Sequence, residues 1–442
     1  MSPQTEVKTD MSENQAPVRT RYGTAIGRRG KYGRHFFGIP YAQAPVGNLR
    51  WKAPGKALPW PHDLDTSFFP PRAIQCERKS TDFYFREFYS DPAFTPPLSE
   101  DCLYLNIWAP EHATGCPVAV FFHGGAMISG WNSEIEFDGE EYARRGIILV
   151  TVSYRLGFPG FFAHPALADE KNDSVCSGNY GLFDQLAAID WIRENIEAFG
   201  GDPGNITLMG QSAGAMCVRA LMTSPAAIGK FQRAILQSGG GMNSRFTIGR
   251  PLIELEEACI DFLKMKRLSL QDFTCLPGTE LAKLGEEFVA AFSSILQTPF
   301  PLSAVTDGYL FPMTFDNAVE KSASSLVPCL LSCTADDLWV EYKGQKNPEE
   351  NYLFRENEAL ADALNKAGIS CHRCYFAHPL PGDGAGAFHS SELWYMFGTL
   401  GRSWRPMTEG DFHLSAEMLD AWAAFMKDGN PGWAEDEVKT FN

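Results

Sequence analysis

Basic side chains are scarce in this 442-residue chain relative to acidic ones. It contains 38 lysines and arginines against 54 aspartates and glutamates, which gives a formal net charge of −16. Binding to the phosphates of DNA or RNA depends on clustered lysine and arginine, and a strongly acidic chain repels such a polyanion. The charge balance therefore argues against nucleic acid as a partner.

Long apolar runs are also missing. No stretch approaches the roughly 20 apolar residues that cross a bilayer. The N-terminal segment MSPQTEVKTDMSENQAP has no apolar core of the kind that a secretory signal contains. We therefore expect a cytoplasmic protein that does not bind membranes. Residues 1–18 are polar and contain two prolines, so we expect them to form a flexible tail.

The eleven cysteines show no pattern typical of disulfides or of a metal site. An odd number, spread over a long chain without a signal segment, favours reduced thiols. Cys371 and Cys374 form a C-x-x-C pair, but they lie in an expected strand, where residues i and i+3 point to opposite faces. No cysteine–histidine cluster has the spacing of metal ligands, so we expect neither a metal nor a cofactor.

The rest of the composition is that of a globular chain, with 44% hydrophobic and 21% charged residues. Apolar runs of strand length alternate with helical patterns, which predicts an α/β fold with a mostly parallel sheet covered by helices on both faces. The strands are expected at 102–110, 118–125, 146–154, 205–210, 233–239, 327–333 and 371–377, and the clearest helices at 181–199 and 414–425. We expect one domain over residues 19–442, with a mainly helical, lid-like insertion at 240–326.

The segment NITLMGQSAGA, residues 205–215, places Ser212 between two glycines. A G-x-S-x-G motif is weak evidence by itself, because a serine in a glycine-rich turn would look the same. Here an apolar run precedes the motif and a proline-free stretch rich in alanine, methionine and leucine follows it. A nucleophile elbow requires this order of strand, serine and helix. Ser212 is therefore the candidate nucleophile.

A serine hydroxyl needs a base that accepts its proton and a third group that orients the base. In α/β hydrolases the chain order is serine, acid, histidine, which leaves four histidines as candidate bases: His372, His378, His389 and His413. His389 lies in the glycine-rich loop GDGAGAFHSSE after the last expected strand, where it can reach across the sheet edge. It is the preferred base, and His378, at the end of that strand, is its main rival.

The candidate acid follows the expected strand at 327–333. Asp336 and Asp337 stand at its end, where functional loops gather in α/β sheets. Only one of two adjacent aspartates can face the histidine, and the pattern alone leaves both open. Aspartate is also common in a turn that ends a strand without any catalytic role.

A developing oxyanion requires backbone N–H donors. One is expected from Ala213, the residue after the nucleophile, at the N-terminus of its helix. Others are expected from Gly124, Gly125 and Ala126, which follow an apolar strand in FFHGGA and let the backbone approach a substrate closely.

Several segments, taken in order, resemble the type-B carboxylesterases, the family that includes the cholinesterases. They are FFGIPYAQAPVGNLRW, SEDCLYLNIW, FFHGGAMISG, VTVSYRLG, GNYGLFDQLAAIDWIRENIEAFGGDPGNITLMGQSAGA, ILQSG and GAFHSSELWYMFG. The resemblance runs from about residue 20 to the end of the chain. It implies an α/β-hydrolase fold and hydrolysis of small-molecule carboxylic esters without a cofactor.

Carried over residue by residue, the resemblance makes Ser212 the nucleophile and His389 the base. It assigns the oxyanion hole to the N–H groups of Gly125, Ala126 and Ala213. The family's usual acid motif, DEG, falls on residues 336–338, so its glutamate corresponds to Asp337. This is a departure, because aspartate is one methylene shorter and its loop must approach His389 more closely.

Other departures from the family pattern narrow the range of expected substrates. Many members have glutamate before the nucleophile, where this chain has Gln211, and no tryptophan lies between Cys76 and Cys102, where the cholinesterases carry their choline-binding indole. A quaternary ammonium would lose both an aromatic face and a nearby anion, so this chain is not expected to be a cholinesterase. We expect Gly124 and Gln211 to contact the substrate.

Cys76 and Cys102 match a pair that is bridged in secreted relatives, but here we expect reduced thiols.

Two other functions use the same scaffold. The triad could act on amides, thioesters or carbamates, since pocket shape rather than the elbow selects the leaving group. A non-catalytic, cholinesterase-like binding protein is the second alternative, and the intact Ser212 and His389 argue against it. The residues between Asp337 and His389 are fewer than in most members, which predicts a wider gorge. The acyl preference and the oligomeric state are not determined by these patterns.

Overall fold

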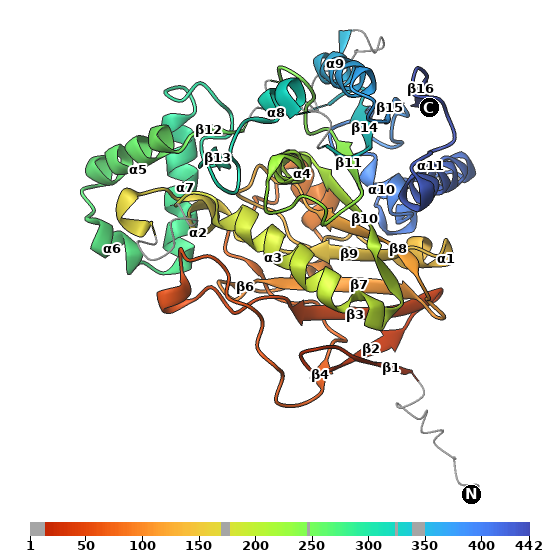
Figure 1. The fold of residues 1–442 in the computed structure, drawn as a ribbon, viewed down its shortest axis with the longest axis horizontal. Coiled ribbons are helices and arrows are strands. Elements are labelled where there is room, and N and C mark those ends of the chain that lie inside the picture. The colour runs from red at the N-terminus through yellow and green to blue at the C-terminus, as the bar shows by residue number, and fades with distance from the viewer. Residues whose placement is uncertain (1–13, 169–176, 245–247, 323–325, 338–349) are drawn as a thin grey trace, which may run out of the picture.

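The computed structural model describes residues 14–168, 177–244, 248–322, 326–337 and 350–442. Twelve strands of these residues form the main sheet (Figure 1). They are β1 (Gln15–Arg19), β2 (Thr24–Arg29), β3 (Gly33–Pro40), β4 (Leu64–Asp65), β7 (Tyr104–Pro110), β8 (Cys116–Phe122), β9 (Ile148–Val152), β10 (Gly201–Gln211), β11 (Arg233–Gln237), β14 (Cys329–Thr334), β15 (Cys371–Phe376) and β16 (Val438–Phe441).

The strand order is β1-β2-β3-β7-β9-β8-β10-β11-β14-β15-β16, with β4 paired to β2. Neighbours from β9 to β16 run parallel, whereas β1, β2, β3, β7 and β9 pair antiparallel in succession. The sheet is therefore mixed and mostly parallel, as the alternation of strand and helix patterns predicted. In such sheets, the loops after the carboxyl ends of the strands build the functional site.

The helices outside the insertion include α1 (Glu140–Arg144), α2 (Gly157–Phe161), α3 (Tyr180–Asn195), α4 (Ala213–Thr223), α9 (Tyr352–Lys366), α10 (Leu393–Met396) and α11 (Glu409–Asp428). Helices α3 and α4 cross in front of the sheet in Figure 1, whereas α10 and α11 lie at its right-hand side. Both predicted helices are present, but α3 ends at Asn195 and a 3-10 turn continues to Phe199, and α11 begins at Glu409, five residues before the predicted start. Gly429 ends α11 in the left-handed conformation, with φ of 88°, which is the usual conformation of a glycine after a helix.

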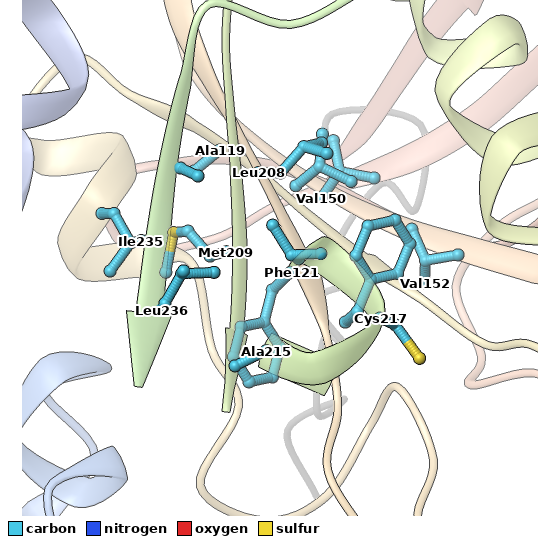
Figure 2. Close-up of a cluster of buried hydrophobic side chains, with 14 of the residues drawn as sticks. Ala119, Phe121, Val150, Val152, Leu208, Met209, Ala215, Cys217, Ile235 and Leu236 are labelled. Atoms are coloured by element: carbon cyan, nitrogen blue, oxygen red, sulfur yellow. The ribbon is translucent and has the colours of Figure 1, made fainter. Parts of the chain in front are cut away.

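The central strands are apolar on both faces. Figure 2 shows Phe121, Val150, Leu208 and Ile235, from four neighbouring strands, in one cluster, and all four are fully buried. Successive strand residues point to opposite faces, so a strand that is apolar throughout must be covered on both sides. Ala215 and Cys217, labelled in the same figure, bring α4 onto this core. The helix that starts at Ser212 is thereby fixed on the sheet.

The prediction of a tail over residues 1–18 is wrong for its last part. Residues 1–13 lie outside the described residues, but Gln15–Arg19 form β1, which pairs antiparallel with β2. Ala16 and Val18 are buried and alternate with exposed neighbours, which is the period of a half-buried strand. Pro17 has no N–H to donate, and it is accommodated because β1 is an edge strand.

The described part of the insertion at 240–326 is mainly helical. Its helices are α5 (Leu252–Lys266), α6 (Leu270–Thr274), α7 (Gly278–Phe292) and α8 (Phe315–Ser322). Helices α5, α6 and α7 gather beside α2 at the left of Figure 1. They enclose a second apolar cluster in which Phe158 packs edge-to-face against Phe288 at a centroid distance of 5.4 Å. Its role as a lid stays a prediction.

A buried ion pair joins the loop after β9 to α3. Arg155 donates from Nε and Nη2 to the carboxylate of Asp184 at 2.8 and 2.7 Å, and their side chains are 2% and 0% exposed. Asp184→Ala leaves the guanidinium buried without its counterion and should lower the free energy of unfolding by about 3–5 kcal/mol. Denaturation in urea measures this loss.

The matched control lies on the same helix. Asp190 pairs with Lys230 at 2.5 Å, but its side chain is 46% exposed. Water screens such a surface pair, so Asp190→Ala should cost less than about 1 kcal/mol. Similar losses for the two variants would contradict the importance of the buried pair.

Candidate active site

Ser212 stands on the turn between β10 and α4. Its backbone has φ 54° and ψ −125°, a sparsely populated conformation for a residue with a side chain. Its N–H donates to the carbonyl of Gln237 at 2.8 Å, which holds the turn against β11. The packing of strand and helix thus maintains a strained turn of the kind that presents a nucleophile.

Both glycines of the motif are required by packing. A Cβ atom on Gly210 would lie 2.3 Å from the backbone carbon of Gly214, and one on Gly214 would lie 2.0 Å from the carbonyl oxygen of Phe122. Real Cβ atoms do not come so close to the backbone, so β10, α4 and β8 can approach only where side chains are absent. The G-x-S-x-G pattern at residues 210–214 is therefore a steric consequence of the elbow.

His389 lies in the loop between β15 and α10, and its Nδ1 forms a short contact with Oδ1 of Asp337. The other oxygen of Asp337 accepts from the Ser238 hydroxyl at 2.6 Å and from the N–H of Thr334 at 3.0 Å. The carboxylate is thus fixed in direction by two donors. The structure brings His389 and Asp337 together, as the alignment of the acid motif predicted.

Asp336 faces a different group. Its carboxylate accepts from the N–H of Ala387 at 2.9 Å, and its own N–H donates to the carbonyl of Ala387 at 2.9 Å. Gly386 has φ 74°, which places the loop backbone against Asp336. Asp336 therefore holds the loop that carries His389 while Asp337 contacts its ring.

The three other candidate histidines are engaged elsewhere. His378 lies 2.9 Å from Asp411, which caps α11, and is not placed at Ser212. His372 points from β15 toward Phe425 and Trp433. His413 is an exposed residue of α11 beside Glu409. Of the candidate bases, His389 is the one that the structure pairs with an aspartate at the end of β14.

The second nitrogen of His389 faces Gln211. Because the Asp337 carboxylate accepts at Nδ1, that nitrogen carries the proton and Nε2 is an acceptor. Nε2 of Gln211 lies 3.2 Å from Nε2 of His389. Ser212 is 8% exposed, and its hydroxyl makes no hydrogen bond to another residue of the described ranges. Active-site hydrogen bonds are often incomplete without substrate. Here the side chain of Gln211, and not the hydroxyl of Ser212, contacts Nε2 of His389.

The loop after β8 lies beside Ser212. A Cβ atom on Gly124 would be 3.1 Å from the Cβ of Ser212. Gly125 and Ala126 have positive φ, 99° and 56°, and neither N–H donates to another residue in the described part of the chain. The N–H of Ala213 is in the first turn of α4, where a helix provides no acceptor. Three backbone donors near the serine are therefore free for an anionic oxygen.

The carboxylesterase family model matches residues 14–368 of this chain. The chain belongs to the carboxylesterase family. It is 34% identical to fumonisin B1 esterase from Sphingopyxis macrogoltabida over 90% of this chain and 79% of that protein. It is 32% identical to para-nitrobenzyl esterase from Bacillus subtilis strain 168 over 94% of this chain and 90% of that protein.

Solved structures give the same result for the fold. A PNB esterase structure superimposes with a TM-score of 0.79 at 30% sequence identity and covers 94% of this chain and 91% of that chain. A thermophilic PNB esterase gives a TM-score of 0.78. The protein is thus a carboxylic ester hydrolase with the α/β-hydrolase fold, as the sequence resemblance implied.

Three side chains of this carboxylesterase that contact the candidate site were not predicted. Ser238 binds Asp337, and Tyr84 donates from its hydroxyl to the carbonyl of His389 at 3.1 Å. Glu392 lies three residues after His389 and accepts weakly from Gln237 at 3.4 Å. Ser238 and Glu392 both fall within segments that match the family, ILQSG and GAFHSSELWYMFG, so their positions carried a signal that pattern alone did not interpret.

The thiols at the family's disulfide position are free. Cys76 and Cys102 form no bridge in the structure, and their reduced state stays an expectation. Burial, mainly, raises the pKa of Cys76 to about 11. Cys371 and Cys374 lie in β15, as predicted. Within the described ranges, no group of three or more histidine, cysteine or acidic side chains could hold a metal, and no helix is long and apolar enough to span a membrane.

The pKa of His389 sets a pH dependence. Burial favours its neutral form, but the charge and hydrogen bond of Asp337, with a smaller contribution from Glu392, outweigh burial and raise the pKa above 6.5. If His389 is the base, it must be neutral in the free enzyme, so kcat/KM should fall as the pH drops through a midpoint above 6.5.

Glu392→Gln provides the control for that profile. Burial and the charge of Asp337 raise the pKa of Glu392 to about 8. The charge of Glu392 is the smallest of the effects that raise the pKa of His389, so the variant should lower the acid midpoint of kcat/KM by less than Asp337→Asn does. A parent midpoint at or below 6.5 would contradict the interaction of His389 with Asp337.

Proposed function

We propose that this carboxylesterase hydrolyses small-molecule esters through an acyl-enzyme formed on Ser212, with His389 as general base and Asp337 as the orienting acid. The observation that supports it best is the short contact between Asp337 and His389 beside the strained turn of Ser212. The free N–H groups of Gly125, Ala126 and Ala213 support the same reaction.

In the first half-reaction, Nε2 of His389 takes the hydroxyl proton while Oγ of Ser212 attacks the ester carbonyl carbon. The carbonyl oxygen becomes an anion that the three N–H groups hold. Asp337 stabilises the imidazolium at Nδ1. The intermediate then expels the alkoxide, which leaves as the alcohol with the proton from Nε2.

In the second half-reaction, water replaces the alcohol. Nε2 of His389 takes a proton from water as its oxygen attacks the acyl carbon of the ester on Ser212. A second oxyanion forms at the same N–H groups, and its collapse releases the carboxylic acid and returns the proton to Oγ. The protein needs no cofactor in either half-reaction.

Gln211 must give up its contact before the first attack. Its amide occupies Nε2 of His389 in the resting structure, and the Ser212 hydroxyl has to take that place. We further propose that the enzyme works in the cytoplasm.

A panel of p-nitrophenyl esters from acetate to decanoate tests the proposed function. We expect hydrolysis that stops after treatment with an organophosphate, with an optimum chain length that reports the size of the acyl pocket. The relatives named for fumonisin B1 and para-nitrobenzyl esters show that members at about this distance differ in substrate. A folded protein that hydrolyses none of the panel and takes up no organophosphate would contradict the proposal.

A further inference from the structure

A cation lies at the edge of the candidate active site. Arg78 is half-buried and donates from Nη2 to the hydroxyl of Ser129 at 3.1 Å. That hydroxyl and the N–H of Ser129 both donate to the carbonyl of Gly125, at 3.2 and 3.0 Å. The guanidinium is therefore one side chain away from the loop whose N–H groups would hold the oxyanion.

The other side of the guanidinium faces the loop of His389. The Cζ atom of Arg78 lies 5.9 Å from the centre of the Tyr84 ring and 5.4 Å from that of Tyr89. The Tyr84 hydroxyl donates to the carbonyl of His389. Arg78 thus lies between the oxyanion loop and the histidine loop, and the two aromatic rings restrict its position and favour its charge.

Arginines near Arg78 have acidic partners, whereas Arg78 has none among the described residues. The paired arginines are Arg72 with Glu77, Arg86 with Asp383, and Arg405 with Glu87. Nε of Arg78 is buried and makes no hydrogen bond within the same ranges. The charge of Arg78 lowers the pKa of the buried Glu134 carboxyl, but burial outweighs this effect and raises that pKa above its usual range.

Within the described ranges, Arg78 is thus a half-buried guanidinium without an ion-pair partner, in a chain with a net charge of −16. At a site edge it offers planar N–H donors that match the geometry of a carboxylate, which forms charge-assisted hydrogen bonds with it. The segment between Cys76 and Cys102 thus places a guanidinium at the edge of the site.

We propose that Arg78 is an anion-binding residue of the substrate site, and that this carboxylesterase prefers esters that carry a free carboxylate. This inference rests on the proposed function, because it assigns a substrate class to the same site. The carboxylate would bind the guanidinium while the ester carbonyl lies at Ser212. The distance between the two groups of the substrate should then decide its rate.

Monomethyl esters of linear dicarboxylic acids test this preference. The series runs from succinate to suberate, and each monoester is compared with a methyl alkanoate in which a methyl group replaces the carboxylate, such as methyl hexanoate for monomethyl adipate. Titration of the released acid measures kcat and KM. We expect kcat/KM to favour the anionic member at one optimum length, and this preference to shrink at high salt.

Three variants separate charge from position. Arg78→Gln removes the charge and should lower the ratio of anionic to neutral kcat/KM by about tenfold or more, mainly through KM, since one charge-assisted hydrogen bond contributes about 1.5–3 kcal/mol. Arg78→Lys keeps the charge and should retain part of the preference. Ser129→Ala keeps the guanidinium but removes its link to Gly125, and should leave the ratio near that of the parent.

An unchanged ratio in Arg78→Gln would overturn the proposal. An equal loss on both substrates, reproduced by Ser129→Ala, would also overturn it, since Arg78 would then only position the oxyanion loop. The proposed function has its own readout, which is hydrolysis of p-nitrophenyl butyrate by the parent. If the parent hydrolyses this neutral ester but shows no preference for carboxylates, the role of Arg78 is refuted and the proposed function is retained.

Discussion

Replacing Ser212 by alanine should lower kcat for p-nitrophenyl butyrate by about 10⁴-fold or more. The variant retains the free N–H groups of Gly125, Ala126 and Ala213, but it has no atom that can form the acyl-enzyme. A residual rate above the uncatalysed reaction is expected, because these donors still stabilise an oxyanion when water attacks directly. Steady-state kinetics with purified variant and parent measure the difference.

One control for Ser212→Ala measures its stability, and the other replaces a second serine of the same site. Ser212 accepts and donates only through its backbone, so Ser212→Ala should unfold at the denaturant concentration of the parent. Ser238→Ala is a matched serine variant at the same site. It removes one of the two donors to Oδ2 of Asp337 and should cost about 1 kcal/mol, less than tenfold in kcat. A Ser212→Ala variant within tenfold of the parent would show that another residue is the nucleophile.

Asp337→Asn should lower kcat by about 10⁴-fold. The carboxylate accepts the proton at Nδ1 of His389, which leaves Nε2 free to act as base. An amide can donate to Nδ1 instead, and His389 would then carry its proton on Nε2, where it cannot accept from serine. Kinetics over a range of pH should also show the acid midpoint of kcat/KM moving down, since the negative charge that raises the pKa of His389 is lost.

Asp336→Asn is the matched comparison, one residue away. Its contacts are to the backbone of Ala387, and an asparagine retains an oxygen that can accept from that N–H. We expect a loss of less than tenfold in kcat and a small decrease in stability, since one hydrogen bond is weakened by about 1 kcal/mol. Equal losses for the two variants, or a larger loss for Asp336→Asn, would contradict the assignment of Asp337.

Local patterns were enough to predict the elbow and seven strands of the sheet, which are β7, β8, β9, β10, β11, β14 and β15. Apolar strands such as β8 and β10 are recognisable in the sequence because they are buried on both faces. The two glycines around Ser212 are recognisable because the turn leaves no room for a side chain, at Gly210 against Gly214 and at Gly214 against Phe122 of β8. The other five strands of the sheet, β1, β2, β3, β4 and β16, were not predicted. β1 has five residues, contains a proline and follows a polar segment, so its half-buried alternation was too short to recognise.

The choice between Asp336 and Asp337 could not be made from residue patterns. Neighbouring residues on an extended chain point in opposite directions, so one of the two had to face away from His389, but the pattern could not say which. The family alignment favoured Asp337, and the contacts of both aspartates agree with it. Asp336 faces the loop of His389 because the N–H of Ala387 in that loop needs an acceptor. Asp337 is thereby left to contact the ring of His389.

Contacts between distant segments were beyond the sequence. Tyr84 and His389 are 305 positions apart, and Gln211 and His389 are 178 positions apart. No periodicity links such residues, because their proximity depends on how the loops after several strands converge at one edge of the sheet. The position of Arg78 between two of these loops has the same origin.

The most direct test of the central assignment is to label the nucleophile. Parent protein is incubated with diethyl p-nitrophenyl phosphate, its intact mass is measured, and the modified peptide is sequenced by mass spectrometry. We predict one diethylphosphoryl group per chain, located on Ser212, with loss of p-nitrophenyl butyrate hydrolysis in proportion to labelling. A label on any other residue, or full activity in a fully labelled protein, would contradict the assignment of Ser212 as the nucleophile.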